Sequence, residues 1–334
     1  MANMIQYFRK TAFLGLLIAA LASCNDHDLP FVGGGTGVDN NSGIPGLKPD
    51  ILGLFAYNGG TEVESNVWQE NLTMGLFLTK DSLDNPYEND RNTYFNIKCV
   101  YSKEGWKTDP KEIKLSDRPA VIYAYSPYIE KVDPLHVPVE CESGRYYMYG
   151  THLEPQTSVR KNDNVAKVLL KQVQALVDFR MKKKDWDGEV VLQQLVIRRK
   201  GFDLTDSLSV AKGLVADSTN ALPIAGEMDI QHGTLVNTTW GQYSSKKIAG
   251  VVTEDFTTSA RIVLPVMPMA IGKDMVEIVF TVNGFQRSVT LRGDQSWKAG
   301  TRNIINLTFT GEGFEIEESI KPWQDIEQDI IVNA

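Results

Sequence analysis

The residue types that carry most protein chemistry are present in this chain, but their spacing matches few reactive sites. The histidines have no partner three or four residues away, so a zinc ion would have to be held across strands. No GxSxG elbow is present, and neither Cys99 nor Cys141 lies in a CxxC or nucleophile motif. The pattern predicts no catalytic residue, no cofactor and no metal, and favours a protein that is not an enzyme. The histidines are His27, His136, His152 and His232.

Carboxylates and tryptophans allow other interpretations. Acidic residues cluster between Asp81 and Asn92, where the spacing misses the EF-hand pattern and a solvated loop is the simpler interpretation. Two carboxylates distant in sequence could still meet as a glycosidase pair, which spacing does not reveal. Tryptophans bind sugars when exposed, although packing beside strands is their commoner role. They are Trp68, Trp106, Trp186, Trp240, Trp297 and Trp323.

One cysteine does stand in a pattern with a defined chemistry. Arg9 and Lys10 precede the uncharged stretch Thr11–Ser23, which is too short for the ~20 residues that span a bilayer. The stretch ends in Leu21-Ala22-Ser23-Cys24, a branched apolar residue and two small residues before a thiol, as in a bacterial lipobox. Residues 1–23 are therefore predicted to be a signal peptide, and Cys24 to carry the lipid that anchors the protein to a membrane.

The charge of the chain limits its partners. Without residues 1–23, which contain Arg9 and Lys10 but no acid, 32 basic and 42 acidic residues remain, a net charge of −10. An acidic body argues against nucleic acid or an anionic membrane surface as a partner. Residues 24–49 are rich in glycine, asparagine and aspartate, and such a composition predicts a flexible tether rather than a core.

Beyond Pro49 the chain shows short apolar or alternating segments separated by turn residues. This spacing, without sustained helical stretches, predicts an all-β protein built from sandwiches. Predicted strands lie at 51–57, 72–79, 95–101, 120–125, 137–141, 189–198 and 261–266. Val276–Val282 and Phe285–Leu291 flank Asn283-Gly284, a dipeptide that predicts a tight hairpin.

Two questions stay open at this level. Residues 165–177 have helical spacing, while 175–181 alternate as a strand does. Cys99 and Cys141 lie in separate strand-like segments, so two separately buried thiols are favoured over the disulfide that export would permit. The polar stretch Thr151–Asn164 predicts a boundary between an N-terminal domain, 50–155, and a C-terminal domain, 156–334.

Several segments in a fixed order resemble the fimbrillin-like family of Bacteroidetes, which provides the subunits and anchors of lipoprotein-derived pili. Besides the lipobox, they are Val121–Tyr128 (VIYAYSPY), Val263-Leu264-Pro265, Ala299-Gly300-Thr301 with the following strand Asn303–Thr310, and Ile320-Lys321-Pro322-Trp323. One departure is Gln174, which stands where a histidine is expected.

This resemblance implies two tandem transthyretin-like β-sandwich domains and export to the outer membrane as a lipoprotein. It also implies assembly by strand donation, in which a protease removes the first strand of a subunit and the terminal strand of the next subunit fills the slot. The family's proteases cut after arginine or lysine. Between Cys24 and Pro49 the only basic residue is Lys48, followed by proline, whereas Lys80 and Arg91 lie well inside the first domain. The chain is thus expected to keep its lipid and its first strand.

The C-terminal segment has the pattern of a half-buried strand. Ile326, Ile330 and Val332 share one face, interrupted by Gln328, and acidic residues with Ile331 occupy the other. These three residues are predicted donor positions, although the strand could instead close its own domain.

The favoured function is a lipid-anchored structural subunit, an anchor or accessory subunit of a fimbria at the cell surface that supports adhesion. Its expected partners are other fimbrial subunits, the outer membrane through Cys24, and a host or bacterial surface ligand. The alternative is a glycan-binding surface lipoprotein of a nutrient uptake system.

Overall fold

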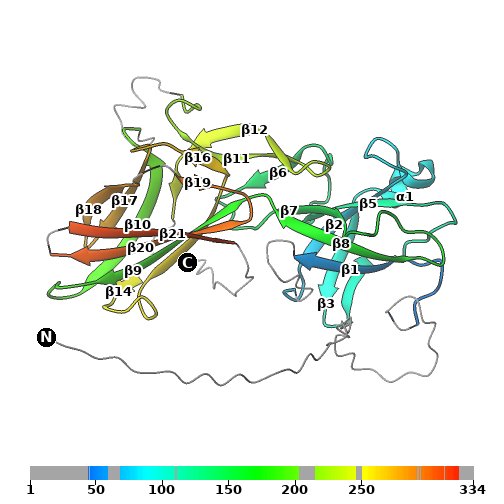
Figure 1. The fold of residues 1–334 in the computed structure, drawn as a ribbon, viewed down its shortest axis with the longest axis horizontal. Coiled ribbons are helices and arrows are strands. Elements are labelled where there is room, and N and C mark those ends of the chain that lie inside the picture. Colours follow the sequence, from blue (N-terminus) through cyan, green and yellow to red (C-terminus); the bar gives the residue numbers. More distant parts are fainter. Residues whose placement is uncertain are drawn as a thin grey trace, which may run out of the picture. The chain divides into compact units, whose positions relative to one another are not determined.

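The computed structural model describes residues 44, 46–58, 68–109, 111–202, 215–245, 250–291, 293, 295–311 and 313–322. Strands dominate this part of the chain (Figure 1). The prediction of an all-β protein is confirmed. Its helices are a 3-10 turn at Tyr87–Asn89 and one turn of α-helix, α1, at Arg91–Tyr94.

The N-terminal half forms a seven-stranded sheet in the order β1-β8-β7-β5-β2-β3-β4. Strand β1 pairs with β8 in parallel, and the other neighbours are antiparallel. The strands are β1 (Gly53–Asn58), β2 (Thr73–Thr79), β3 (Ile97–Ser102), β4 (Gly105–Asp109), β5 (Val121–Ser126), β7 (Met148–His152) and β8 (Val165–Gln172).

The remaining strands form smaller sheets. A four-stranded sheet contains β15 (Arg261–Val266), β9 (Ala175–Lys183), β20 (Thr301–Thr310) and β21 (Gly313–Pro322), in that order. A second sheet has the order β13 (Tyr243–Ser244), β10 (Val190–Arg199), β17 (Val276–Val282), β18 (Phe285–Thr290), and β14 (Gly250–Val252) also pairs with β10. The others are β12 (Thr234–Gly241), β11 (Leu222–Asp229), β6 (Val137–Glu140), and the pair β16 (Met269–Ile271) and β19 (Gln295–Trp297).

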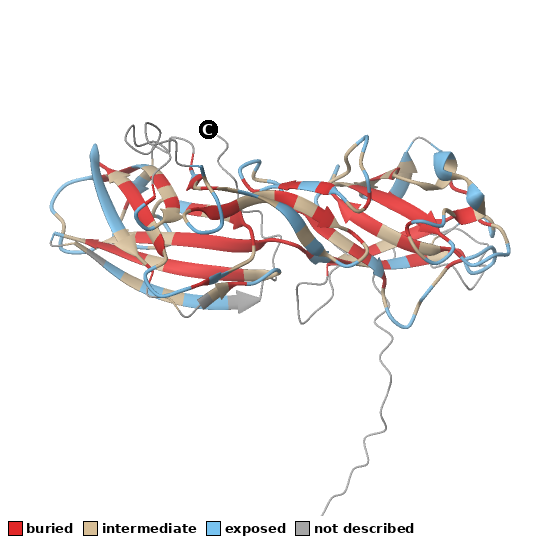
Figure 2. Ribbon diagram, turned by 90° about the horizontal axis from the view of Figure 1, so that it is seen from above, coloured by how far each residue is buried: buried red, intermediate tan, exposed pale blue. Residues whose placement is uncertain are grey.

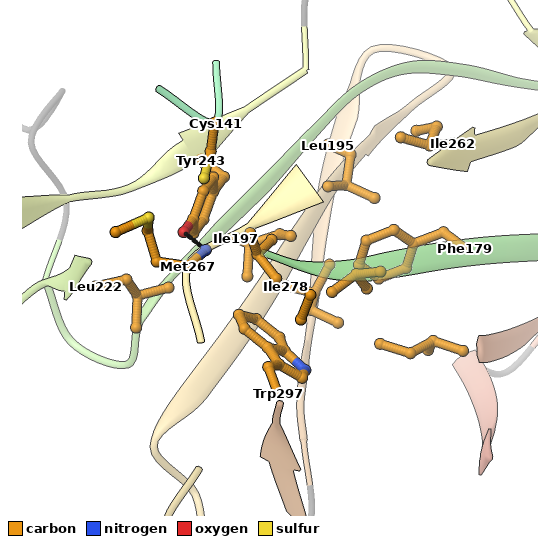
Figure 3. Packing of buried hydrophobic residues seen from close by; sticks show 14 of the residues in the cluster. Cys141, Phe179, Leu195, Ile197, Leu222, Tyr243, Ile262, Met267, Ile278 and Trp297 are labelled. Carbon is orange, nitrogen blue, oxygen red and sulfur yellow. Dashed lines mark hydrogen bonds between the residues drawn. The ribbon is translucent and has the colours of Figure 1, made fainter. Parts of the chain in front are cut away.

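Buried side chains form two hydrophobic clusters. The first, which we call the main cluster, contains residues from both halves of the chain, from Phe77 and Tyr125 of the seven-stranded sheet to Phe309 of β20. Figure 2 marks the buried residues along the ribbon, and Figure 3 shows part of the cluster around Tyr243 and Trp297. Tyr243 lies in this cluster, and its buried hydroxyl accepts from the Met267 amide at 2.9 Å and donates to the Pro223 carbonyl. The second cluster, formed only by residues 52–170, lies on one face of the seven-stranded sheet and includes Leu54, Leu76 and Val168. Alternation along each strand therefore sets which cluster a residue joins.

The strands predicted from alternation are confirmed to within a few residues. The Asn283-Gly284 dipeptide forms the β17–β18 turn with φ values of 49° and 80°, as a type I′ turn requires. The ambiguous segment 165–183 forms two strands, β8 and β9. Burial alternates along β8, whereas β9 is buried on both faces over most of its length, and these tertiary contacts override the helical spacing.

The polar stretch Thr151–Asn164 connects β7 and β8, which are hydrogen-bonded neighbours in one sheet. Residues 165–172 thus belong to the same sheet as β1, while β6 pairs with β11, whose residues lie far along the chain. The division into two domains at 155/156 stays a prediction.

Candidate functional site

The residues predicted to act in anchoring and donation, Cys24 and Ile326, Ile330 and Val332, lie outside the described residues. The structure does describe the acceptor side of the expected strand donation, which is the first strand and the slot that it occupies. We call β1 together with its contacts the first-strand site.

Strand β1 lies at one end of the seven-stranded sheet, beside β8 (Figure 1). Its register pairs Gly53 with Val165 and continues to Asn58 with Leu170. Leu54 and Ala56 are 4% and 1% exposed and join the second hydrophobic cluster. Alternate residues of β1 therefore fill an apolar slot, which is the arrangement that β-augmentation requires of an inserted strand.

Hydrogen bonds from distant residues fasten this strand. The Leu52 amide donates to the Ile113 carbonyl at 2.8 Å, and the Gly53 amide donates to the Asn164 carbonyl at 2.9 Å. The indole N–H of Trp68 donates to the Ala56 carbonyl at 2.8 Å. Both edges of β1 are thus engaged along part of its length, which protects an edge strand from exchange.

The residues just before β1 are also packed against the sheet. The Leu115 amide donates to the Asp50 backbone carbonyl at 2.8 Å, and the Asn162 amide donates to the Pro49 carbonyl at 2.8 Å. A Cβ atom added to Gly53 would lie 2.6 Å from Leu47 and 2.8 Å from Ile44. The side chains of Ile44 and Leu47, at the end of the segment expected to be a flexible tether, 24–49, therefore lie close over β1 at position 53.

The peptide bond between Lys48 and Pro49 is held in this packing. The Lys48 carbonyl accepts hydrogen bonds from the Ile51 amide at 3.0 Å and from the Asn164 side-chain amide at 2.9 Å. Asn164 also donates to the Ile51 carbonyl. A protease must polarise the scissile carbonyl, so these two bonds add a structural obstacle to that imposed by proline.

The next basic residues lie where cutting would destroy the sheet. Lys80 follows β2, which stands between β5 and β3. The Arg91 guanidinium lies 4.4 Å from the centre of the Phe95 ring, in the first turn of α1. No lysine or arginine occurs from Pro49 to Thr79, so trypsin-like cleavage after either residue would separate β1 and β2 together from the rest of the sheet.

A buried histidine supports the strand beside β1. The His152 Nε2 atom accepts from the Ile122 amide at 3.0 Å, so Nδ1 carries the proton and donates to Gln156 Oε1 at 3.1 Å. Gln156 in turn donates to the Val165 carbonyl and accepts from the Lys167 amide. Burial lowers the pKa of His152, because the charged form is poorly solvated there.

The remaining candidate chemistry is inert in the described residues. Cys99 and Cys141 are both buried and not joined in a disulfide, which confirms the favoured interpretation. Burial raises the pKa of both thiols, that of Cys141 to about 11, so neither is a ready nucleophile. The described part of the chain contains no group of three or more histidine, cysteine or carboxylate residues able to hold a metal.

Three tryptophans, Trp68, Trp106 and Trp297, are buried, so packing is their role. No helix among the described residues has the length and apolarity needed to cross a bilayer.

Sequence reasoning did not identify Asn164 or Trp68 as fastening residues. Asn164 lies in a polar stretch that looks like a linker, and its contacts with Lys48 and Ile51 span more than 110 positions. Only covariation between positions that are distant in sequence could have revealed its role, because nothing in the local sequence pattern distinguishes this asparagine from a turn residue.

These observations define a structural class: an all-β protein whose own first strand fills an apolar slot in the sheet. The fimbrillin-like family model matches residues 61–323. The chain therefore belongs to the fimbrillin-like family.

Solved structures support the fold assignment. A candidate cell adhesion protein from Bacteroides ovatus ATCC 8483 is 14% identical, with 82% of this chain and 98% of that chain covered and a TM-score of 0.58. Another from Bacteroides uniformis ATCC 8492 is 15% identical, with 82% and 99% covered and a TM-score of 0.54. The sequence matches none of the curated proteins with which it was compared.

Proposed function

We propose that this chain is a terminal, lipid-anchored structural subunit of a fimbria on the outer membrane and supports adhesion without catalysing a reaction. Family membership supports the fimbrial role. The observation that carries the terminal role is the first-strand site, where β1 fills the slot and is fastened by Trp68, Ile113 and Asn164.

In assembly by strand donation, a subunit in the middle of a filament needs an emptied slot and a strand to donate. This chain offers no lysine or arginine at which β1 alone could be removed. A slot that keeps its own strand accepts nothing from a neighbour, because its edge groups and apolar positions are already satisfied. Such a subunit joins others only as a donor, and the lipid on Cys24 would place it at the base of the filament.

The donor in this proposal is the C-terminal segment with Ile326, Ile330 and Val332. Burial of each in a partner's slot stabilises the junction by roughly 1.5 to 3 kcal/mol. We expect truncation after Trp323 to eliminate co-purification with neighbouring fimbrial subunits while shifting the thermal midpoint of the monomer by no more than a few degrees.

Substitution provides a matched test in the full-length chain. Serine at Ile326, Ile330 and Val332 together should abolish co-purification, whereas serine at Ile331, on the opposite strand face, should retain it. A truncated monomer that unfolds many degrees lower would show that the segment closes its own core, and donation would have to be abandoned.

A further inference from the structure

The connection between β5 and β7 leaves the sheet to which both strands belong. These strands are antiparallel neighbours, with Ser126 paired to Met148, so a short hairpin loop could join them. Residues 127–147 instead include β6, which pairs with β11 in a sheet whose third strand is β12 (Figure 1). We call residues 134–141 the strap. The N-terminal half thus supplies a strand to a sheet of the C-terminal half.

The strap is bonded to β11 beyond the limits of β6. All residues of β6 have antiparallel partners in β11. At one end, the Cys141 amide donates to the Ile224 carbonyl at 3.2 Å. At the other end, the Ile230 amide donates to the Pro134 carbonyl at 3.1 Å. The pairing between the two halves is therefore longer than β6 alone.

One side of the strap is packed in the main cluster. Val137 and Val139 are fully buried and belong to that cluster, whereas Pro138 and Glu140 alternate with them and are exposed. The main cluster also contains residues of the seven-stranded sheet and of β20. The strap therefore belongs to a core that both halves share.

A buried glutamine connects the strap to the point where the chain passes from β8 to β9. Gln174 lies between these strands and is fully buried. Its side chain accepts from the Tyr147 amide at 3.0 Å and donates to the sulfur of Cys141, the last residue of the strap, at 3.4 Å. Its carbonyl accepts from the Gly300 amide at 2.9 Å, just before β20. The position at which the family resemblance predicts a histidine thus joins the strap to both halves.

A second contact between the halves lies beside β7. Tyr149 of β7 covers the turn between β11 and β12, where Gly233 has a φ of 68°. A Cβ atom added to Gly233 would lie 1.8 Å from Cζ of the Tyr149 ring. The ring therefore leaves no space for a side chain in this turn, and the positive φ also favours glycine.

We propose that the strap couples the two halves of the chain into one cooperative unit, so that neither half unfolds or hinges independently of the other. Domains of one chain usually move relative to each other unless their interface is large and apolar. Here a strand from one half completes a sheet of the other half, so separation of the halves requires the strap to leave β11. A pull between the two ends of the chain, as in a filament, passes through both halves and is resisted by this pairing.

Pulse-labelling hydrogen exchange during urea unfolding of the full-length chain measures the two halves separately. Peptides from β3 report on the N-terminal half, and peptides from β17 report on the C-terminal half. We expect the same urea midpoint for both strands in the wild type, because the residues of one cooperative unit lose protection together. Wild-type midpoints that differ by ~0.5 M urea or more would overturn the proposal.

Two matched variants distinguish the strap from a general loss of stability. The strap variant is Val137→Ala with Val139→Ala, and the control is Val159→Ala with Val168→Ala, which changes two equally buried valines of the second cluster. The midpoints of β3 and β17 should separate by ~0.5 M urea or more in the strap variant and should fall together in the control. Midpoints that fall together in both variants would show that other contacts couple the halves, and the role of the strap would be rejected. Where a double variant does not fold, Val139→Ala and Val168→Ala alone provide the same comparison.

Discussion

Strands β1 and β18 both stand at the edge of a sheet, but different contacts hold them. Among the described residues, strand β18 pairs only with β17, its immediate neighbour in sequence, and its first four residues are exposed, Phe285 at 70%. Strand β1 pairs with β8, more than 100 residues away, and is fastened by Ile113 and Asn164. The hairpin strand β18 is therefore held by contacts that are local in sequence, whereas β1 is held by contacts with residues distant in sequence.

The difference indicates which edge assembly can use. A hairpin strand stays attached through its turn whatever happens to its outer side. The first strand can be exchanged in principle, because it is joined to the rest of the sheet only by the chain that follows it. Its side chains and hydrogen bonds then decide whether it is kept, and in this chain they favour retention.

The largest expected contrast between the two edges is in apolar contacts. Leu54→Ala on β1 removes a buried side chain and leaves a cavity, so the free energy of unfolding should fall by about 2–5 kcal/mol. Phe285→Ala on β18 removes an exposed ring and should change it by no more than about 0.5 kcal/mol. Urea unfolding of the two variants measures both values, and equal losses would show that β1 is no better packed than the hairpin.

Hydrogen bonding gives a smaller contrast between two asparagines that each bond to two backbone groups. Asn164→Ala leaves the buried carbonyl of Ile51 without its donor and should cost about 1–3 kcal/mol. Asn283→Gly preserves the positive φ of the hairpin turn and loses bonds to Val191 and Glu189 that are exposed. Its cost should stay below about 1 kcal/mol because water replaces those bonds.

Limited trypsin digestion of the Asn164→Ala variant sharpens the test. Loss of the Asn164 side chain removes one of the two hydrogen bonds to the Lys48 carbonyl, so cleavage after Lys48 should become faster. Cleavage near Lys48 that remained as slow as in the wild type would assign its resistance to Pro49 alone.

The smallest expected effect is a pH dependence centred on β7 and β8. The pKa of His152 is lower in the folded state than the value of ~6.5 typical of an unfolded chain. The unfolded state therefore takes up the proton first, and the free energy of unfolding falls as pH drops below about 6.5, by at most ~1.4 kcal/mol per pH unit. His152→Gln should lose this component, while His232→Gln, at an exposed histidine, should retain it. Identical pH profiles for wild type and His152→Gln would contradict the assignment.

Much of the fold could be predicted from local patterns. Alternation predicted the strand at Arg261–Val266 with its observed limits, and Asn283-Gly284 predicted the hairpin turn. Helical spacing at 165–177 was misleading because the segment joins two different strands. Burial alternates along β8, while β9 is buried on both faces, so apolar residues occur at successive positions there.

The first-strand site could be predicted only in part. The absence of lysine and arginine from Pro49 to Thr79 is visible in the sequence and anticipates that β1 is kept. The fastening by Asn164 could not be predicted, since it joins residues separated by more than 110 positions. Local periodicity carries no information about which distant strands become neighbours.

The most direct test of the central claim, that this subunit keeps its first strand, is the intact mass of the protein extracted from membranes with detergent. The account predicts one dominant species that begins at a lipidated Cys24 and still contains β1. A dominant species beginning at Pro49 would remove the lipid anchor from the proposal. A dominant species beginning at Asp81 or Asn92, after cleavage behind Lys80 or Arg91, would contradict retention of the first strand and make the chain a stalk subunit.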